Sequence, residues 1–280
     1  MKSLEYYQMS GKKLYDILHL DTFPLAIKYI RSLDEIPEGV LRPSMTGCKM
    51  TLCGAFTRAR RNGDSVAMTS DDNVCTPSTV GHGWGDLHPE VFIQSQVKQG
   101  WHMDINAERK RSNAIANTLG YESFEKFFEN IGGQYCGFVC SPLPSSIVVP
   151  DTVMIYCNGV QITHIIHALC YDYEHVPKSS FEGFEESCLK GGLAPFLTQK
   201  PQIVIPGAGD RVFSGGTQDH ELAISFPGKL LFYVMENIFK TGGAMNPGMP
   251  LKLHSLTHIT EDITPGYRFA KDEIDKLEKK

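Results

Sequence analysis

Three cysteines in separate parts of the chain have neighbours that suit a bound inorganic group. Cys53 is followed by glycine and alanine, Cys75 by Thr-Pro-Ser, and Cys188 by two glycines one helical turn further on. Small neighbours allow a cluster or ligand to approach the backbone closely. A closed four-thiolate zinc site is not expected, because the paired CxxC spacing is missing. Three thiolates from separate elements instead predict a [4Fe-4S] cluster whose fourth iron is free or held by another group.

The remaining cysteines favour other roles. Cys136 and Cys140 are four residues apart, about 13 Å along an extended strand, which is too far to chelate one zinc ion. Cys157 and Cys170 lie in apolar surroundings, where a free cysteine usually acts as a small core residue. Cys48 can share a site with Cys53 only from a loop before the helix. Ordinary core thiols remain the competing interpretation for the whole set.

One histidine near these thiols suits proton transfer. His82 stands in a Gly-His-Gly-Trp turn, seven residues after Cys75. An imidazole titrates near neutral pH, so we expect His82 to act as general acid/base or as an extra cluster ligand. The standard hydrolase, nucleotide-binding and zinc-peptidase motifs are missing from the sequence.

Four charged residues are candidates for a catalytic or substrate-anchoring role. Asp210 and Arg211 lie between glycine-rich segments after a buried-looking strand, where α/β folds often place binding loops. An internal Asp–Arg pair explains them equally well. Lys28 and Arg58 could hold a carboxylate or phosphate, although a solvated charge is the ordinary role of such side chains.

Composition narrows the class of protein. A net charge of −5 over 280 residues argues against a nucleic-acid binder, which needs a clustered basic surface. No apolar run approaches the roughly 20 residues that span a bilayer, and the amphipathic N-terminus is unlike a secretory signal. We therefore expect a cytoplasmic protein that does not act on membranes and whose eight cysteines are not a disulfide framework. A homo-oligomer is compatible with this composition.

Helical and alternating hydrophobic patterns are interspersed, which predicts an α/β or α+β fold with helices packed on a mixed sheet. We expect a single compact domain over 1–280 with a helical C-terminal extension, since no long linker or repeat divides the chain. The stretch 70–86 is expected to be a loop. The helices are expected at 10–19, 50–61, 104–130 with a break near Gly120, 159–171, 184–198 and 229–240, and the strands at 24–30, 65–69, 132–143, 152–157, 201–207 and 221–227.

Several of these stretches, in this order, resemble domain-of-unknown-function family 169, a set of bacterial and archaeal proteins found largely in anaerobes. The resemblance covers most of residues 20–230. It rests on PLAIKYI, LCGAFTRARRNGDSVAMTSDDNVC, DTVMIYCNGVQITHIIHAL, SCLKGGLAPFLTQKPQIVIPGAGDRVFSG and DHELAISFP. It implies that the recurring cysteines of the family fall on Cys53, Cys75 and Cys188. The loop after Cys75 departs from the Cys-Pro-Gly-Gly that the family usually shows.

These observations favour an iron–sulfur enzyme. An open-site cluster on the three cysteines would act as a Lewis acid on a small anionic substrate, in lyase or sulfur-transfer chemistry. Arg58, Arg211 or Lys28 would fix the anionic end, with Asp210 beside them, and His82 would move a proton. Two alternatives remain: a carrier that binds haem, another tetrapyrrole or a metal without turnover, and a small-molecule binder whose thiols are core residues.

Overall fold

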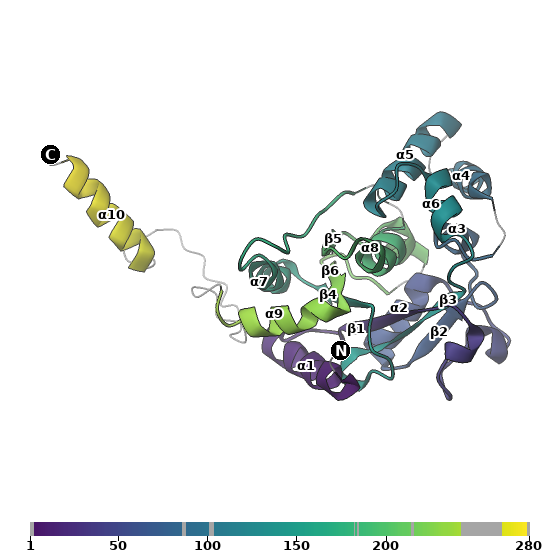
Figure 1. Ribbon diagram of the computed structural model, residues 1–280, viewed down its shortest axis with the longest axis horizontal. Helices are drawn as coiled ribbons and strands as arrows, with labels where there is room; N and C mark the ends of the chain where they lie inside the picture. Colours follow the sequence, from purple (N-terminus) through teal and green to yellow (C-terminus); the bar gives the residue numbers. More distant parts are fainter. Residues whose placement is uncertain are drawn as a thin grey trace.

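Six strands form one sheet in the order β2-β3-β1-β4-β6-β5 (Figure 1). The computed structural model describes residues 3–85, 88–100, 104–181, 183, 185–213, 216–241 and 265–278. All five pairings between neighbouring strands are antiparallel. The predicted class is confirmed in its α+β form, with an antiparallel sheet rather than a mixed one. The strands are β1 Leu25–Ile30, β2 Val66–Thr69, β3 Gly137–Pro142, β4 Thr152–Cys157, β5 Gln202–Val204 and β6 Leu222–Pro227.

Both faces of the sheet are buried. Alternate residues of a strand point to opposite faces, and in β1 the side chains of Leu25 and Ile27 join one core cluster while Ala26 joins another. This double burial explains why the strands read as continuous apolar runs rather than as alternating ones. The structure is therefore three layers deep, with helices on each side of the sheet.

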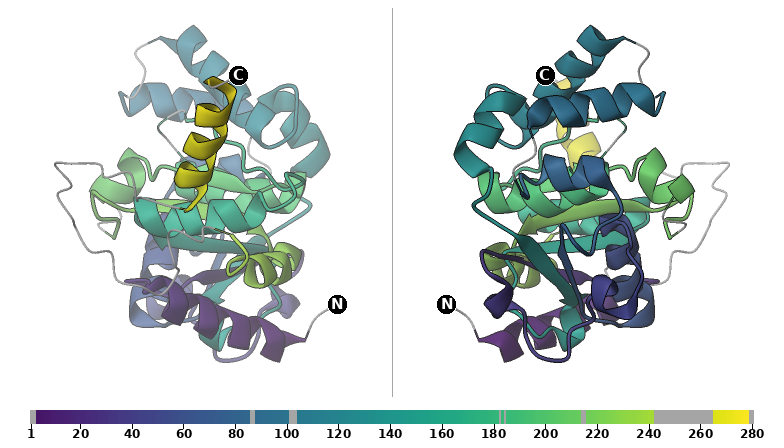
Figure 2. Two further views of the ribbon diagram at one scale, coloured as in Figure 1. Left: turned by 90° about the vertical axis from the view of Figure 1, so that its left-hand side faces the viewer. Right: turned by 90° about the vertical axis from the view of Figure 1, so that its right-hand side faces the viewer.

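The helices divide between the two faces (Figures 1 and 2). The core around Ala26 is covered by α1, α7 and α9, and the core around Ile27 by α2 and α8, with α3–α6 extending it at one end of the molecule. The helices are α1 Leu4–Leu18, α2 Leu52–Asn62, α3 Thr76–Gly81, α4 Pro89–Lys98, α5 Ile105–Thr118, α6 Phe124–Ile131, α7 Gly159–Leu169, α8 Ala194–Thr198, α9 Leu231–Asn237 and α10 Pro265–Glu278, with π-helical turns η4 Glu186–Leu193 and η5 Gly209–Phe213.

Local structure differs from the sequence-based expectation at several points. The first helix begins at Leu4, where Ser3 caps it, and not at residue 10 as expected. The expected loop at 70–86 contains α3, because Pro77 at the second helical position is compatible with a first turn. Helix α4 was not expected. The single helix expected at 184–198 is a π-helical turn followed by α8.

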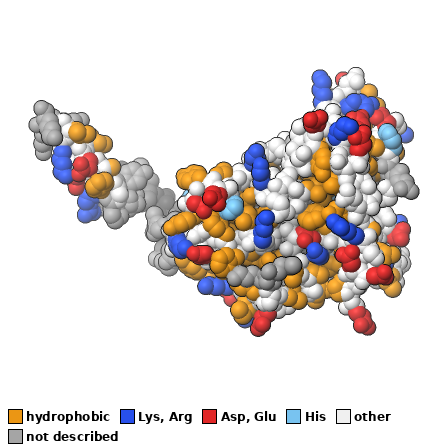
Figure 3. Space-filling view, viewed as in Figure 1, with side chains coloured by type: hydrophobic (Ala, Val, Ile, Leu, Met, Phe, Trp, Pro, Cys, Tyr) orange, Lys and Arg blue, Asp and Glu red, His pale blue; other side chains and the backbone are white. Residues whose placement is uncertain are grey.

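The visible surface carries no dominant patch of one charge. Figure 3 shows acidic and basic side chains interspersed over the face that it displays. In the part of the chain that the structure describes, no helix has the length and hydrophobicity needed to cross a membrane.

Candidate functional site: a cavity lined by three thiols

Cys53, Cys75 and Cys188 line one small cavity of about 80 Å³. It adjoins a larger groove of about 920 Å³, to which Cys53 and Cys75 also contribute. The structure therefore brings together the three thiols that the sequence singled out. The other residues around the cavity are Thr51, Leu52, Pro77, Ser78, Gln96, Gln99, Glu185, Gly209 and Asp210.

Two of the thiols stand at helix N-termini. Cys53 is the second residue of α2, and Thr51 caps that helix by accepting a hydrogen bond from the Gly54 amide at 3.0 Å. Cys75 is the residue that precedes the first turn of α3. The side chain of Asn73 fixes it, accepting from the Cys75 amide at 3.0 Å and donating to the Cys75 carbonyl at 2.9 Å. Backbone N–H groups at helix starts favour negative charge, which suits thiolate ligands.

The third thiol lies on the π-helical turn η4. Glu185 precedes this turn in the left-handed region, with φ 49°, and the Cys188 thiol donates to the Glu185 carbonyl at 3.8 Å. The two glycines after Cys188 have a packing role. A Cβ on Gly191 would lie 2.7 Å from Met154 Cε, and one on Gly192 would lie 3.1 Å from the Tyr29 hydroxyl. These glycines bring η4 close to the sheet, and their small size serves that contact.

The environment of the cavity favours the protonated form of two of its thiols, Cys53 and Cys75. The adjacent Cys188 thiol, burial and the nearby Asp210 together raise the pKa of Cys53 well above its usual value. Burial also raises the pKa of Cys75, although hydrogen bonds from Ser78 oppose this. The described lining contains no lysine, arginine or histidine. A bound metal group would supply the missing positive charge and displace the thiol protons.

Two buried oxygen atoms in the cavity wall have no hydrogen-bond partner among the described residues. Asp210 Oδ1 and Gln96 Oε1 make no hydrogen bond of normal geometry with any described residue, although the Cys53 thiol and the Ser187 hydroxyl stabilise the charged form of Asp210. Burial nevertheless raises the pKa of Asp210. Buried polar atoms are normally satisfied. Because both of these atoms are acceptors, a cation or a hydrogen-bond donor bound in the cavity would satisfy them.

A buried ion-pair network supports one wall. Arg111 Nη1 lies 2.8 Å from Glu185 Oε2, and Arg111 Nη2 lies 2.6 Å from Glu108 Oε1. Gln96 Nε2 donates to Glu185 Oε1 at 2.9 Å. Sequence reasoning missed this network. Its residues come from α4, α5 and the start of η4, and no short spacing in the sequence links these segments.

The three cavity thiols do not form a ready-made site for a single metal ion. Within the described ranges, no three Cys, His, Asp or Glu side chains converge closely enough to hold a single metal ion. In a tetrahedral zinc site with bonds of about 2.3 Å, all ligands meet at one centre. The three thiols instead border one cavity from three elements, and in a cluster each thiolate would bind a separate iron. Together with the unsatisfied acceptors, this arrangement fits an iron–sulfur cluster.

The structure does not bring the other candidates to the described lining of this cavity. Arg58 pairs with Asp64 at an exposed position, and Lys28 pairs with Asp151 at 3.0 Å. Arg211 is engaged by main-chain carbonyls, including Pro206 at 3.0 Å and Glu221 at 3.0 Å. Of the proposed catalytic set, Asp210 alone is in the wall.

His82 is buried behind the cavity. Its Nδ1 lies 2.8 Å from the Ser78 carbonyl, and its ring packs against Tyr29 and Trp84. The neighbouring glycines explain this position. A Cβ on Gly81 would lie 2.9 Å from Leu189 Cδ1, and Gly83 has φ +68° and approaches Gly132. The Gly-His-Gly-Trp turn is therefore a packed junction.

Burial of His82 predicts a loss of stability in acid. Desolvation lowers its pKa from 6.5 to about 4, so the unfolded chain binds the extra proton first as the pH falls below 6.5. This linkage costs about 2 kcal/mol of unfolding free energy between pH 7 and pH 5. Urea unfolding at both pH values should show a smaller pH dependence in His82→Phe than in the unmodified protein. The exposed His220→Gln should not reduce it, and an equal pH dependence in all three proteins would contradict the assignment.

Comparison with known proteins adds a family without a known activity. The model of family DUF169, described as uncharacterised ArCR, matches residues 13–237. Uncharacterized protein MJ0308 of Methanocaldococcus jannaschii is 23% identical over 233 residues, which cover 82% of this chain and 92% of that protein. No solved structure matches the chain. The match spans all three cavity thiols.

Proposed function

The chain belongs to this uncharacterised family, and we propose that it is an iron–sulfur enzyme with an open-site [4Fe-4S] cluster on Cys53, Cys75 and Cys188. The observation that supports the proposal is the shared cavity of three thiols and two unsatisfied oxygen acceptors, whose described lining contains no cation. Free thiols on a working site require a reducing compartment, which favours the cytoplasm.

When bound, the cluster would supply an iron that acts as a Lewis acid toward a hydroxyl, carboxylate or sulfur atom. The residues of the chain would perform the other tasks. Asp210 faces the cavity, and because burial raises its pKa, it would hold or release a proton close to the reacting atoms. Glu185 is fixed by Arg111 and Gln96 and would keep the wall in place.

The adjoining groove would hold the body of a small anionic substrate. Lys98 belongs to its described lining, and Val74 and Pro77 supply apolar contacts. Lys98 lies at the end of α4 and is exposed. It therefore takes the anchoring role that the sequence suggested for Arg58, Arg211 or Lys28. Lyase or sulfur-transfer chemistry fits this arrangement, because an open iron can act as a Lewis acid on a bound hydroxyl or sulfur atom without changing its oxidation state.

Controlled oxidation tests the open site. A cluster held by three cysteines has one iron without a thiolate, and that iron should be lost first. We expect the anaerobically reconstituted protein, after mild oxidation, to lose about one iron of four and to develop the paramagnetic resonance signal of a three-iron cluster. Added ferrous iron together with a reductant such as dithionite should reverse the change, because the three-iron cluster must take up one electron along with the iron. Retention of all four irons would show that a fourth protein ligand exists and would contradict the open site.

A further inference from the structure

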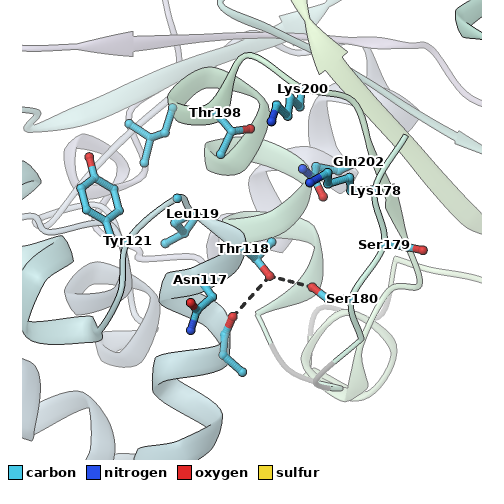
Figure 4. Close-up of a pocket in the computed structure, with 13 residues that line it drawn as sticks. Asn117, Thr118, Leu119, Tyr121, Lys178, Ser179, Ser180, Thr198, Lys200 and Gln202 are labelled. Atoms are coloured by element: carbon cyan, nitrogen blue, oxygen red, sulfur yellow. Dashed lines mark hydrogen bonds between the residues drawn. The ribbon is translucent and has the colours of Figure 1, made fainter. Parts of the chain in front are cut away.

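A second cavity of about 770 Å³ lies between the end of α5, the segment 178–180 and the chain that leads from α8 into β5 (Figure 4). None of its lining residues belongs to the thiol cavity. Its volume falls in the range of about 300–1,000 Å³ typical of small-molecule sites. Nothing in the proposed iron–sulfur chemistry uses it.

The polar lining of this cavity is positive. Lys178 and Lys200 line it, and no aspartate or glutamate is part of its described lining. Neither lysine forms a salt bridge with a residue that the structure describes. Unlike the paired Lys28 and the buried Lys190, they are available to a ligand.

The backbone places these charges together. The backbone at Lys178 pairs with the edge strand β5. The Lys178 amide donates to the Pro201 carbonyl, and the Lys178 carbonyl accepts from the Ile203 amide, both at 3.1 Å. Lys200 lies two residues before Gln202, at the bend that leads into β5, and Figure 4 draws its side chain near those of Gln202 and Lys178. Lys178 and Gln202 lie together at one end of the cavity in Figure 4.

The wall beside these charges is already formed. The Thr118 and Ser180 hydroxyls are 2.6 Å apart, and the buried Lys190 donates to the Ser180 carbonyl. These contacts fix segment 178–180 against α5. At the opposite end, Tyr121 offers an aromatic ring (Figure 4). A preformed site loses less entropy when its ligand binds.

We propose that this cavity binds a small organic dianion, a phosphate monoester or a dicarboxylate. Two lysines match two negative charges, and lysine holds phosphate and carboxylate oxygens as a point charge. The Gln202 amide would supply a hydrogen bond, whereas the Thr118 and Thr198 hydroxyls already donate to the Ala114 and Ala194 carbonyls. The cavity is larger than a phosphate group alone requires, so the organic part of the ligand would pack against Tyr121.

Calorimetric titration of the full chain tests this proposal with glycerol 3-phosphate and succinate as dianions and glycerol as the neutral probe. We expect saturable binding of at least one dianion at one site, and no binding of glycerol. The double variant Lys178→Gln/Lys200→Gln should weaken binding about a hundredfold, since a charged hydrogen bond contributes about tenfold or more. The exposed pair Lys12→Gln/Lys229→Gln is the matched control and should bind normally.

A further variant separates this site from the thiol cavity. Cys75→Ser should keep its affinity for the dianion, because Cys75 does not line the second cavity. Absence of saturable binding by both dianions would overturn the proposal. So would binding that survives in the Lys178/Lys200 variant or disappears in Cys75→Ser.

Discussion

Replacement of Cys75 by serine should abolish cluster binding while leaving the fold intact. The Cys75 thiol is half-buried at the start of α3, and its loop is held by the Asn73 side chain rather than by the sulfur. A serine hydroxyl is a harder and less acidic ligand than a thiol, so it competes poorly for iron. Loss of a supporting outer-shell residue already costs about 10–100-fold in metal affinity, and loss of a direct ligand should cost more.

The measurement is anaerobic reconstitution with iron and sulfide, followed by visible absorbance and activity once a substrate is known. Cys48→Ser is the matched control, because Cys48 is exposed and lies outside the described lining of the cavity. We expect the control to acquire a cluster and Cys75→Ser to remain colourless. The far-ultraviolet circular dichroism of Cys75→Ser should match that of the unmodified protein. Retention of both cluster and activity in Cys75→Ser would refute the assignment.

Replacement of Arg111 by glutamine should destabilise the protein by about 3–5 kcal/mol, the usual cost of removing one partner from a buried ion pair. The Arg111 side chain is 6% exposed and contacts two carboxylates, Glu108 and Glu185, which are 0% and 10% exposed. The substitution removes the Arg111 cation from both acids. Urea unfolding at pH 7 measures the effect directly.

The neighbouring Arg109→Gln is the control, since its pair with Glu90 is 41% and 31% exposed and should contribute at most about 1 kcal/mol. The pH dependence gives a second check. Burial raises the pKa of Glu185 and Arg111 lowers it, so the pKa rises further in Arg111→Gln. As the pH falls, the folded variant then takes up a proton before the unfolded chain does. The difference in unfolding free energy between the variant and the unmodified protein should therefore shrink from pH 7 to pH 5. Equal stability of the two variants would contradict the network.

The sequence predicted which thiols share a cavity better than it predicted the residues around them. The neighbours of Cys53, Cys75 and Cys188 are informative because local backbone geometry depends on local residue types. The end of α2 at Gly63, with φ 84°, was likewise predictable from the residue itself. Hydrophobic composition identified all six strands, since each is a short apolar run bounded by turn residues.

Tertiary contacts determined what the sequence left open. Lys28 and Arg58 carry the right charge for an anion anchor, yet Asp151 and Asp64 lie next to them in the fold. His82 appeared to be in an open turn because two glycines flank it, whereas those glycines permit close packing against Leu189 and Gly132. No pattern in a single sequence distinguishes a glycine that frees a loop from one that admits a neighbouring side chain.

The iron and acid-labile sulfide content of the unmodified protein, purified without oxygen, decides whether the three thiols hold a cluster. We expect about four of each per chain, with a broad absorbance shoulder at about 400 nm. A sharp Soret band would identify a haem carrier instead and contradict the cluster. Colourless protein without stoichiometric iron, both as isolated and after reconstitution, would also contradict it and leave the three thiols as residues of a small-molecule pocket.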